Sequence, residues 1–518
     1  MPGRPLPLVR GAMLLASVAG AAAIACSAPA RRALPLPRVR YAPVTHGVAA
    51  GDVSSDRVVI WSRTDRTAAM HVAVEDGART ARGLAWATAA HDFAAKATIE
   101  GLTPGTEHRY TVWFSDEEGT PPPPPPLATG GVFRTAPGEN AAVPVTFGWS
   151  GDLGGLQVCR DPARGYPIFR TLDGAGLDFF LGLGDMIYAD QPCAAKNMYG
   201  EPQIPIGIGA ATTLREYWAY WRYNREDAGL RRLLAGTGYY AVWDDHEVVN
   251  DFGPGTDYHL YPPYAPFASL IPLGRRALLD ENPIATDPQA PDRLHRAFRW
   301  GKTLDLVLLD TRSFRDDNAA PDTGPRPKTM LGQEQRAWLV DRLRRSDATW
   351  KIVASSVPIA VPTGRGGSAG HDGWAGYDLD VGFERELRAI FSDLRDGGVQ
   401  NVVFLTTDVH FSTGIRYRPF PESHDFSVIE LSAGPLGAMP LPTEALDDSL
   451  HPERLFLYRP GPGPRSFDEA QTWMNWGKVV IDAAGRFALT IHDGNGREVE
   501  HLDLTPGVPR GSRGTLGG

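Results

Sequence analysis

The sequence lacks an excess of basic residues. Its 518 residues include 52 Lys and Arg against 61 Asp and Glu, which gives a formal net charge of −9. Because nucleic-acid backbones bind basic surfaces, this balance argues against a general nucleic-acid binder. It does not argue against a small phosphorylated substrate, because bound metal ions can dominate the field inside a site. Any attraction for phosphate is therefore expected to come from a site and not from the whole surface.

Long apolar runs are also missing, apart from one near the amino terminus. The segment 11–25 follows Arg4 and Arg10, is rich in Ala and Leu, and is too short for a comfortable membrane span. Small-residue cleavage patterns follow it, so residues 1–30 are expected to be a signal peptide. Cys26, just after the run, is a candidate for lipid attachment to a membrane. The protein is therefore expected outside the cytoplasm, in a periplasmic, secreted or cell-surface location.

Cysteine is scarce, with three residues in the whole chain. If Cys26 is removed or lipidated, Cys159 and Cys193 remain as an even pair in an oxidising compartment. They follow Asp152 and Asp185 by several residues. Either a disulfide ties these two loops together, or both cysteines are unpaired buried thiols. The sequence alone does not give their separation.

The composition is that of a globular protein, with 42% hydrophobic and 22% charged residues, and the length allows two or three domains. Residues 41–137 contain short alternating runs and are expected to form an all-β, fibronectin type III-like domain. Its signature is the corner Leu102-Thr103-Pro104-Gly105 before a strand, in which Tyr110 is predicted to pin the corner through its hydroxyl. Residues 505–518 are expected to be a flexible tail.

Residues 143–504 alternate apolar runs with amphipathic stretches, which is typical of layered α/β folds. The expected strands are 144–149, 179–183, 239–243, 304–309, 350–354 and 402–405. The expected helices include 214–234, 333–345 and 383–394.

Acidic and imidazole side chains follow these strands at the point where each one ends. They are Asp152, then Asp185 with Tyr188, then Asp244-Asp245-His246-Glu247, then Asp310, and finally Asp408 with His410. Ligands of open α/β sheets bind beyond the carboxyl ends of the strands, so these groups should converge. Crowded carboxylates repel one another, and carboxylate and phenol oxygens suit a hard metal ion that removes the repulsion. Asp310 on its own is more typical of a turn or helix cap.

Several longer motifs resemble one family. They are His46-Gly47-Val48-Ala49-Ala50-Gly51-Asp52, Gly184-Asp185-Met186-Ile187-Tyr188, Trp243-Asp244-Asp245-His246-Glu247-Val248, Leu309-Asp310-Thr311-Arg312-Ser313-Phe314-Arg315, Leu331-Gly332-Gln333-Glu334-Gln335-Arg336-Ala337-Trp338-Leu339 and Asp408-Val409-His410. The pattern resembles the PhoD-like alkaline phosphatases and phosphodiesterases of the calcineurin-like metallophosphatase superfamily, over nearly the whole mature chain. The resemblance implies an α/β fold, a four-layer metallophosphatase β-sandwich flanked by helices and preceded by the fibronectin-like domain.

The resemblance also implies a metal centre. Asp185 would bridge two metals, the first bound by Asp152, Tyr188 and His410 and the second by Asp245 and Asp408. The first is expected to be Fe(3+), which a phenolate suits, and the second Ca(2+), because its ligands are all oxygens; Zn(2+), Mn(2+) or Mg(2+) are alternatives. Many relatives carry Cys where this chain has Asp152, and Thr407 replaces a usual Gly before Asp408.

Three further residues receive candidate roles, His246 and Asp372 by the same resemblance and Arg312 by its chemistry. His246 is expected to act as catalytic acid or charge stabiliser beside Asp185. Arg312 either binds a substrate phosphate through two hydrogen bonds or braces the sheet. Asp372 either lines the pocket or supplies a metal ligand.

The expected function is that of a secreted, metal-dependent phosphoesterase of the alkaline phosphatase D type. It would hydrolyse small phosphate mono- or diesters by metal-activated hydroxide, without a Ser or Cys nucleophile. One alternative is a phospholipase D-like phosphodiesterase acting on phospholipid head groups, with 258–273 as a candidate lid. Another is a non-catalytic surface-binding protein, which would use the β domain and the proline run 121–126 for adhesion.

Overall fold

The computed structural model describes residues 40–116, 122–126, 128–254, 267–364, 371–376, 381–423, 425–442 and 445–507. The expected signal peptide with Cys26, residues 258–266 of the candidate lid and the tail from 508 lie outside the described residues. In the described ranges, no helix has both the length and the apolar character that a membrane crossing requires.

One large sheet carries the first expected strands of the catalytic part. Its strands, counted over the described residues, run in the order β21-β20-β19-β9-β10-β11-β2-β3-β6. They are β2 (Val48–Gly51), β3 (Arg57–Arg63), β6 (Ala94–Glu100), β9 (Val145–Ser150), β10 (Phe179–Leu183), β11 (Gly238–Val242), β19 (Asn475–Ile481), β20 (Phe487–Asp493) and β21 (Glu498–Leu504). The central strands β9, β10, β11 and β2 are parallel, and antiparallel strands extend the sheet on both sides.

A second sheet carries the remaining expected strands. Among the described residues its order is β12-β13-β14-β15-β17-β16-β18. The strands are β12 (Arg296–Trp300), β13 (Leu304–Leu308), β14 (Trp350–Ala354), β15 (Val402–Thr406), β16 (Ser412–Tyr417), β17 (Val428–Ser432) and β18 (Pro452–Tyr458). Strands β13, β14, β15 and β17 are parallel.

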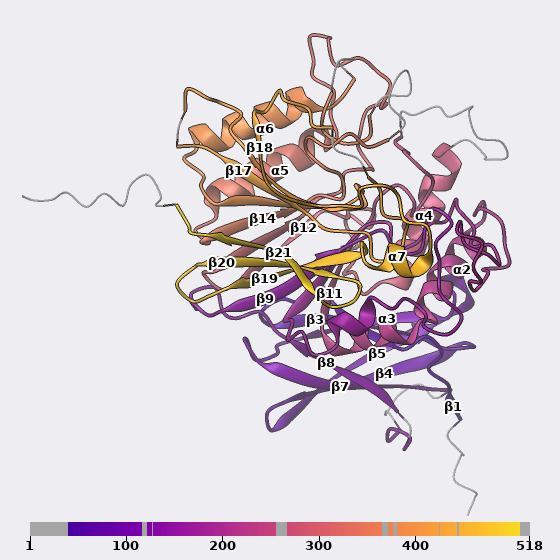
Figure 1. Ribbon diagram of the computed structural model, residues 1–518. Helices are drawn as coiled ribbons and strands as arrows, with labels where there is room; N and C mark the ends of the chain where they lie inside the picture. Colours follow the sequence, from indigo (N-terminus) through magenta and orange to yellow (C-terminus); the bar gives the residue numbers. More distant parts are fainter. Residues whose placement is uncertain are drawn as a thin grey trace, which may run out of the picture. The chain divides into compact units, whose positions relative to one another are not determined.

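The two sheets pack face to face, and helices cover their outer faces (Figure 1). Among the residues that the structure describes, five helices lie on the first sheet: α1 (Phe169–Leu172), α2 (Leu214–Arg225), α3 (Ala228–Gly236), α4 (Phe267–Glu281) and α7 (Phe467–Gln471). Two lie on the second: α5 (Gly332–Arg345) and α6 (Glu384–Asp396). Phe147, Leu181 and Leu306 belong to the apolar core between the sheets. This arrangement confirms the predicted four-layer α/β sandwich.

The prediction of one continuous helix over 214–234 is wrong. The structure divides this stretch into α2 and α3 at Glu226 and Asp227. The Asp227 carboxylate accepts a hydrogen bond from the Leu230 N–H at 2.9 Å and caps α3. It also accepts one from the Tyr166 N–H at 2.9 Å. Aspartate is a preferred residue at helix N-termini, and here it begins a new helix inside a continuous helical pattern.

The front part of the chain forms a smaller sheet of β1 (Tyr41–Ala42), β4 (Ala68–Asp76), β5 (Arg79–Ala87), β7 (Glu107–Ser115) and β8 (Thr129–Arg134). Strands β2, β3 and β6 come from the same stretch of chain but belong to the large sheet. In that sheet β2 pairs with β11 in parallel, with Ala50 opposite Gly238. The large sheet therefore crosses the boundary expected between residues 137 and 143.

The fibronectin-like corner is held by a residue other than the predicted one. In the described part of the chain the Tyr110 hydroxyl is buried without a hydrogen-bond partner, so the expected pin is wrong. His108 takes this place, because its ring nitrogens lie 3.0 Å from the Glu75 carbonyl and 3.2 Å from the Thr103 carbonyl. A histidine two residues before the tyrosine therefore joins the corner to the neighbouring strand.

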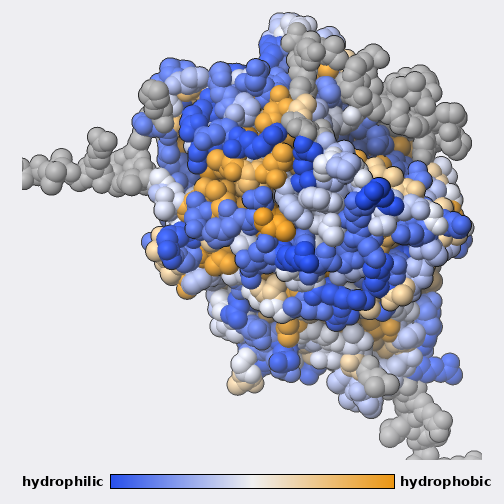
Figure 2. All heavy atoms as spheres, viewed as in Figure 1, coloured by the Kyte–Doolittle hydropathy of each residue, from blue (hydrophilic) through white to orange (hydrophobic). Residues whose placement is uncertain are grey.

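Most of the face in Figure 2 is hydrophilic, with hydrophobic residues gathered beside the edge strands β18 and β21. Leu455, Val499 and Leu502 of these strands are half-buried and pack against the core between the sheets. The apolar area is therefore the open rim of the sandwich core.

Candidate metal centre

The strand register brings the expected ligand-bearing loops together. Gly182 of β10 lies opposite both Ser150 of β9 and Ala241 of β11. The loops that begin after these strands therefore start side by side at one edge of the sheet. Strand β15 of the facing sheet ends at Thr406 and contributes the loop that carries Asp408 and His410.

Four residues expected to bind metal have left-handed backbone conformations. The φ angles are +59° at Asp152, +52° at Asp185, +72° at Asp408 and +58° at His410. Side-chain-bearing residues adopt this region at a cost, and such residues concentrate at functional sites. The surrounding structure must therefore hold these turns in place.

Glu247 holds two of the turns. Its Oε1 accepts a hydrogen bond from the Met186 N–H at 2.8 Å, and its Oε2 accepts from the N–H groups of Asp185 at 2.9 Å and Asp244 at 2.8 Å. Glu247 is fully buried. The last acid of the Asp-Asp-His-Glu motif is therefore a brace that fixes the backbone of its neighbours, and it has no place in the acidic cluster.

Four carboxylates form the first group of the centre. Asp185, Asp244, Asp245 and Asp408 each place one oxygen within 4.8 Å of the others. In the described chain, the Oδ2 atoms of Asp185, Asp244 and Asp408 are buried without a hydrogen-bond partner. Burial, and then repulsion from neighbouring acids, raises the pKa of Asp185 and Asp408 well above their usual range. A divalent or trivalent cation fits this group because it supplies the partner that these oxygens lack.

Asp152, Tyr188 and His410 form the second group. His410 Nε2 lies 3.0 Å from the Tyr188 hydroxyl and 3.6 Å from Asp152 Oδ1, an oxygen without a hydrogen bond to any described residue. The other ring nitrogen, Nδ1, lies 2.6 Å from the Met439 carbonyl, which orients it as the donor and leaves Nε2 as an acceptor, the form in which an imidazole nitrogen binds metal. The Thr407 hydroxyl donates to Asp152 Oδ2 at 2.6 Å, so the threonine in the place of the usual glycine orients this carboxylate.

His246 lies between the two groups and is oriented by an acid that the sequence analysis did not identify. Its Nδ1 is 2.7 Å from Asp190 Oδ1, and its ring stacks on Tyr188 with centroids 4.1 Å apart. Burial alone would lower the pKa of His246, but the carboxylates of Asp190 and Asp245 outweigh burial and raise it to about 10. In the metal-free protein the imidazole therefore favours its cationic form, with Nδ1 turned to Asp190.

Arg312 is fully buried and its guanidinium is bound by protein groups. Nε donates to Asp244 Oδ1, and NH1 donates to Asp372 Oδ1 at 2.7 Å. NH2 donates to the second oxygen of Asp372. Of the two roles expected for Arg312, these contacts support bracing. Asp372 in turn forms a further group of close carboxylates with Asp245 and Asp251.

The structure adds residues that the pattern did not single out. Asp244 and Glu247 were inside a recognised motif, but their separate roles depend on side-chain direction. Asp190 follows Asp185 by five positions, and Asp251 belongs to none of the recognised motifs. Asp310 stays outside the clusters, because its Oδ1 accepts from the Trp243 indole N–H at 2.9 Å and from the N–H groups of its own turn.

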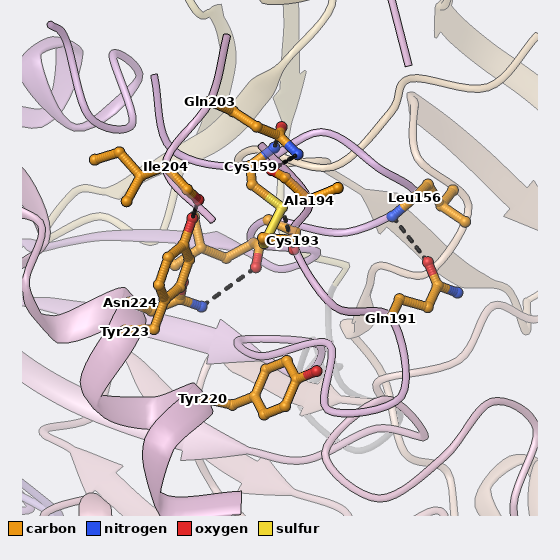
Figure 3. Close-up of a disulfide and its surroundings, with 12 residues drawn as sticks. Leu156, Cys159, Gln191, Cys193, Ala194, Gln203, Ile204, Tyr220, Tyr223 and Asn224 are labelled. Carbon is orange, nitrogen blue, oxygen red and sulfur yellow. Dashed lines mark hydrogen bonds between the residues drawn. A yellow bond between two sulfur atoms is a disulfide. The ribbon is translucent and has the colours of Figure 1, made fainter. Parts of the chain in front are cut away.

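A disulfide joins the loop that follows Asp152 to the loop that follows Tyr188 (Figure 3). It links Cys159 to Cys193 and resolves the alternatives left open by the sequence in favour of pairing. Beside it, the Gln191 side-chain oxygen accepts from the Leu156 N–H at 2.9 Å. The covalent link and this hydrogen bond both connect the loop after Asp152 with the loop after Tyr188.

Comparisons with known proteins agree with this centre. Residues 155–461 match the family described as PhoD-like phosphatase, and residues 29–137 match its N-terminal domain. Alkaline phosphatase D of Bacillus subtilis (strain 168) is 28% identical over 433 residues, spanning 78% of this chain and 70% of that protein.

Solved structures share the fold, and two of them illustrate it. A structure of PhoD matches with a TM-score of 0.68 at 21% identity, over 92% of this chain and 94% of that one. Purple acid phosphatase PPD1 from yellow lupin (Lupinus luteus) seeds matches with a TM-score of 0.55 at 12% identity, over 89% of this chain and 74% of that one. The family match spans more than half of the sequence and confirms the resemblance seen in the motifs. The chain therefore belongs to the PhoD-like phosphatase family and is a metal-dependent phosphoesterase.

Proposed function

We propose that this protein hydrolyses small phosphate mono- or diesters at a centre holding iron(III) and calcium. Asp152, Tyr188 and His410 would hold the iron, with Asp185 shared between the metals. Asp244, Asp245 and Asp408 would complete the calcium shell. The single observation that carries the proposal is the convergence of buried carboxylate oxygens without hydrogen-bond partners, all in described residues.

The difference between the two donor sets supports a different metal in each. A phenol, an imidazole and a carboxylate suit a trivalent, hard transition metal, whereas a shell of carboxylate oxygens suits calcium. When bound, the two cations offset the negative charge of the phosphate oxygens and lower the pKa of a water molecule.

The protein supplies the proton. Asp190 binds Nδ1 of His246, so the proton on Nε2 is the one available to the leaving oxygen of the ester. Stacking on Tyr188 fixes the plane of the imidazole beside the second ligand group. His246 therefore acts as general acid or as a donor that stabilises the developing negative charge.

The alternative of a non-catalytic surface-binding protein is set aside, because the family and the centre are those of an enzyme. Phospholipid head groups remain the second substrate class to test, since their diester bond requires the same chemistry. Export from the cytoplasm is also part of the proposal. It is supported by the signal pattern in residues 1–30 and by the Cys159–Cys193 disulfide, which suits an oxidising compartment. Lipid attachment at Cys26 would anchor the exported protein to a membrane.

The test combines elemental analysis of the purified mature protein with hydrolysis of aryl phosphate monoesters, diesters and phosphatidylcholine. We expect iron and calcium in the protein, and activity that disappears on chelation. Asp185→Asn should abolish hydrolysis, and Tyr188→Phe should remove any visible tyrosinate–iron absorption, while Asp468→Asn, at an exposed carboxylate, should change neither. A protein without metal that stays inactive after iron, calcium or zinc is supplied would refute the proposal.

A further inference from the structure

One buried asparagine lies behind the two turns that carry Asp152 and Asp185. Asn224 belongs to the last turn of α2 and is 4% exposed. Its side-chain nitrogen donates to the Met186 carbonyl at 2.7 Å and, at longer range, to the Leu153 carbonyl at 3.4 Å. Met186 directly follows Asp185 in the chain, and Leu153 directly follows Asp152. One amide group therefore contacts both of these ligand-bearing turns.

The carbonyl groups of Leu153 and Met186 depend on this amide. In the described part of the chain, no other donor forms a hydrogen bond with either of them. Both residues are buried, so bulk water cannot take the place of the amide. A buried carbonyl without a partner destabilises the conformation that buries it. Removing the Asn224 amide would therefore leave two buried acceptors unpaired, each directly beside one of the acids of the centre.

Tyr166 determines which end of the amide faces the turns. Its buried hydroxyl donates to the Asn224 side-chain oxygen at 2.8 Å. Because this oxygen is occupied by Tyr166, the amide nitrogen is directed at the two carbonyls. The Tyr166 N–H in turn donates to Asp227 Oδ2 at 2.9 Å, and Asp227 Oδ1 caps α3. The break between α2 and α3 therefore anchors the residue that orients Asn224.

Asn224 supports a part of the turns that Glu247 does not reach. Glu247 accepts from the N–H groups of Asp185 and Met186. Asn224 instead donates to the carbonyl that follows them. Asp152 and Asp185 both have left-handed backbone conformations, which persist only where the surrounding structure holds them. Buried side chains from two different elements therefore hold the backbone on both sides of Asp185.

We propose that Asn224, oriented by Tyr166, is a positioning residue for the metal group formed by Asp152, Tyr188 and His410. It acts through the backbone, because its amide fixes the turn that carries Asp152 relative to the turn that precedes Tyr188. Without the amide the turns would shift apart, and the carboxylate and the phenol would no longer suit one ion. The proposal rests on the proposed function in taking these three residues as metal ligands, whichever metal they hold.

The test is Asn224→Leu, which keeps the branched shape of the side chain and removes its donors. We expect this variant to bind iron(III) about 10- to 100-fold more weakly in competition with a chelator, as for other groups that position metal ligands. At saturating iron, its tyrosinate–iron absorption should shift in wavelength, because the Tyr188 oxygen would lie differently against the metal. Asn140→Leu, at an exposed asparagine, is the matched control and should change neither property.

A purely structural role for Asn224 gives a different result. It would lower the unfolding temperature of the metal-free variant but leave the iron affinity and the absorption maximum of the folded, saturated protein unchanged, and this outcome would overturn the proposal. Tyr166→Phe keeps the amide and removes only the hydroxyl that orients it. It should weaken iron binding by about 3- to 10-fold, as expected for one neutral hydrogen bond. If Asn224→Leu does not fold, unchanged iron affinity in Tyr166→Phe overturns the proposal.

The unaltered protein separates this proposal from the proposed function. Its iron content and its hydrolysis of aryl phosphates test the proposed function. If it binds no iron, cobalt(II) takes the place of iron in the same comparison, because the visible absorption of cobalt(II) also reports on its ligands. A protein that binds neither ion would refute both proposals. A protein that binds one of them, while both variants keep its affinity and spectrum, would refute the role of Asn224 alone.

Discussion

Asp190→Asn tests whether His246 is held as a protonated donor. Asp190 Oδ1 lies 2.7 Å from His246 Nδ1, and Oδ2 accepts from the Asn250 N–H at 3.1 Å. An asparagine has one carbonyl oxygen and one NH2 group, so with its oxygen on the Asn250 N–H its NH2 would face His246 Nδ1, which can accept that hydrogen bond only when it is unprotonated. The substitution also removes the negative charge that favours the imidazolium.

The size of the effect follows from the type of hydrogen bond that is lost. Hydrogen bonds to charged groups contribute about 1.5–3 kcal/mol and neutral ones about 0.5–1.5 kcal/mol. The difference of about 1–1.5 kcal/mol corresponds to about one pKa unit and, where the donor acts in the slow step, to about tenfold in kcat. Burial opposes the charge on His246, whereas Asp190 and Asp245 raise its pKa to about 10. Asp190→Asn should therefore lower this pKa.

The assay is the pH dependence of kcat for an aryl phosphate. A histidine with a raised pKa is cationic below that pKa and loses its proton as the pH rises through it. The decline of kcat at high pH should therefore begin about one unit lower in Asp190→Asn, and kcat below it should fall about tenfold. Asp468→Asn removes the same charge from a carboxylate that is 78% exposed and should leave the profile unchanged. An Asp190→Asn profile that overlays the original within twofold would show that His246 does not act as the proton donor.

Three further predictions concern stability and metal binding. Replacing Cys159 and Cys193 by serine should lower the free energy of unfolding by about 4 kcal/mol for a sequence separation of 34, as measured by urea denaturation; a loss under 1 kcal/mol would contradict it. Glu247→Gln should lower the free energy of unfolding by about 2–4 kcal/mol and reduce the metal content, because an amide cannot accept from all three N–H groups. Full metal occupancy of this variant by elemental analysis would refute the bracing role of Glu247. In metal-free protein, burial raises the pKa of Asp244 from 3.8 to about 7, against the opposing charge of Arg312. The stability that the protonated Asp244 side chain contributes is then lost as the pH rises through about 7. The temperature of half-unfolding should therefore be lower at pH 8 than at pH 4, and calcium should restore it.

The sequence was sufficient for the layered fold because its strands are buried on both faces. The run Phe179–Leu183 is apolar at every position, and the structure has β10 with the same bounds. Such runs, each followed by a polar turn, identify strands without reference to their partners. Pairing is a different matter. Val48–Gly51 and Arg57–Arg63 have the alternation of a small β domain, but they hydrogen-bond within the catalytic sheet, and no local pattern records that choice.

The site was predictable to the extent that ligands follow strand ends. Asp152, Asp185, Asp408 and His410 lie directly after β9, β10 and β15, and the sheet register brings them together. Side-chain direction within one motif was not predictable. Asp244 and Glu247 are three residues apart, yet one joins the acidic group and the other accepts backbone hydrogen bonds.

The crossing of the domain boundary by the large sheet bears on how the metal centre is held. Strand β11, which leads into Asp244 and Asp245, pairs on one side with β10 and on the other with β2 from the front part of the chain. Asp52, just after β2, accepts from Arg296 Nε at 2.9 Å, and Arg296 also donates to the Ala241 carbonyl at 2.7 Å. Without the front segment, β11 would become an edge strand with unpaired backbone groups, and this ion pair would be lost. The front segment therefore supports the strand that carries the acids, and it cannot be treated as an appended module that is separable from the centre.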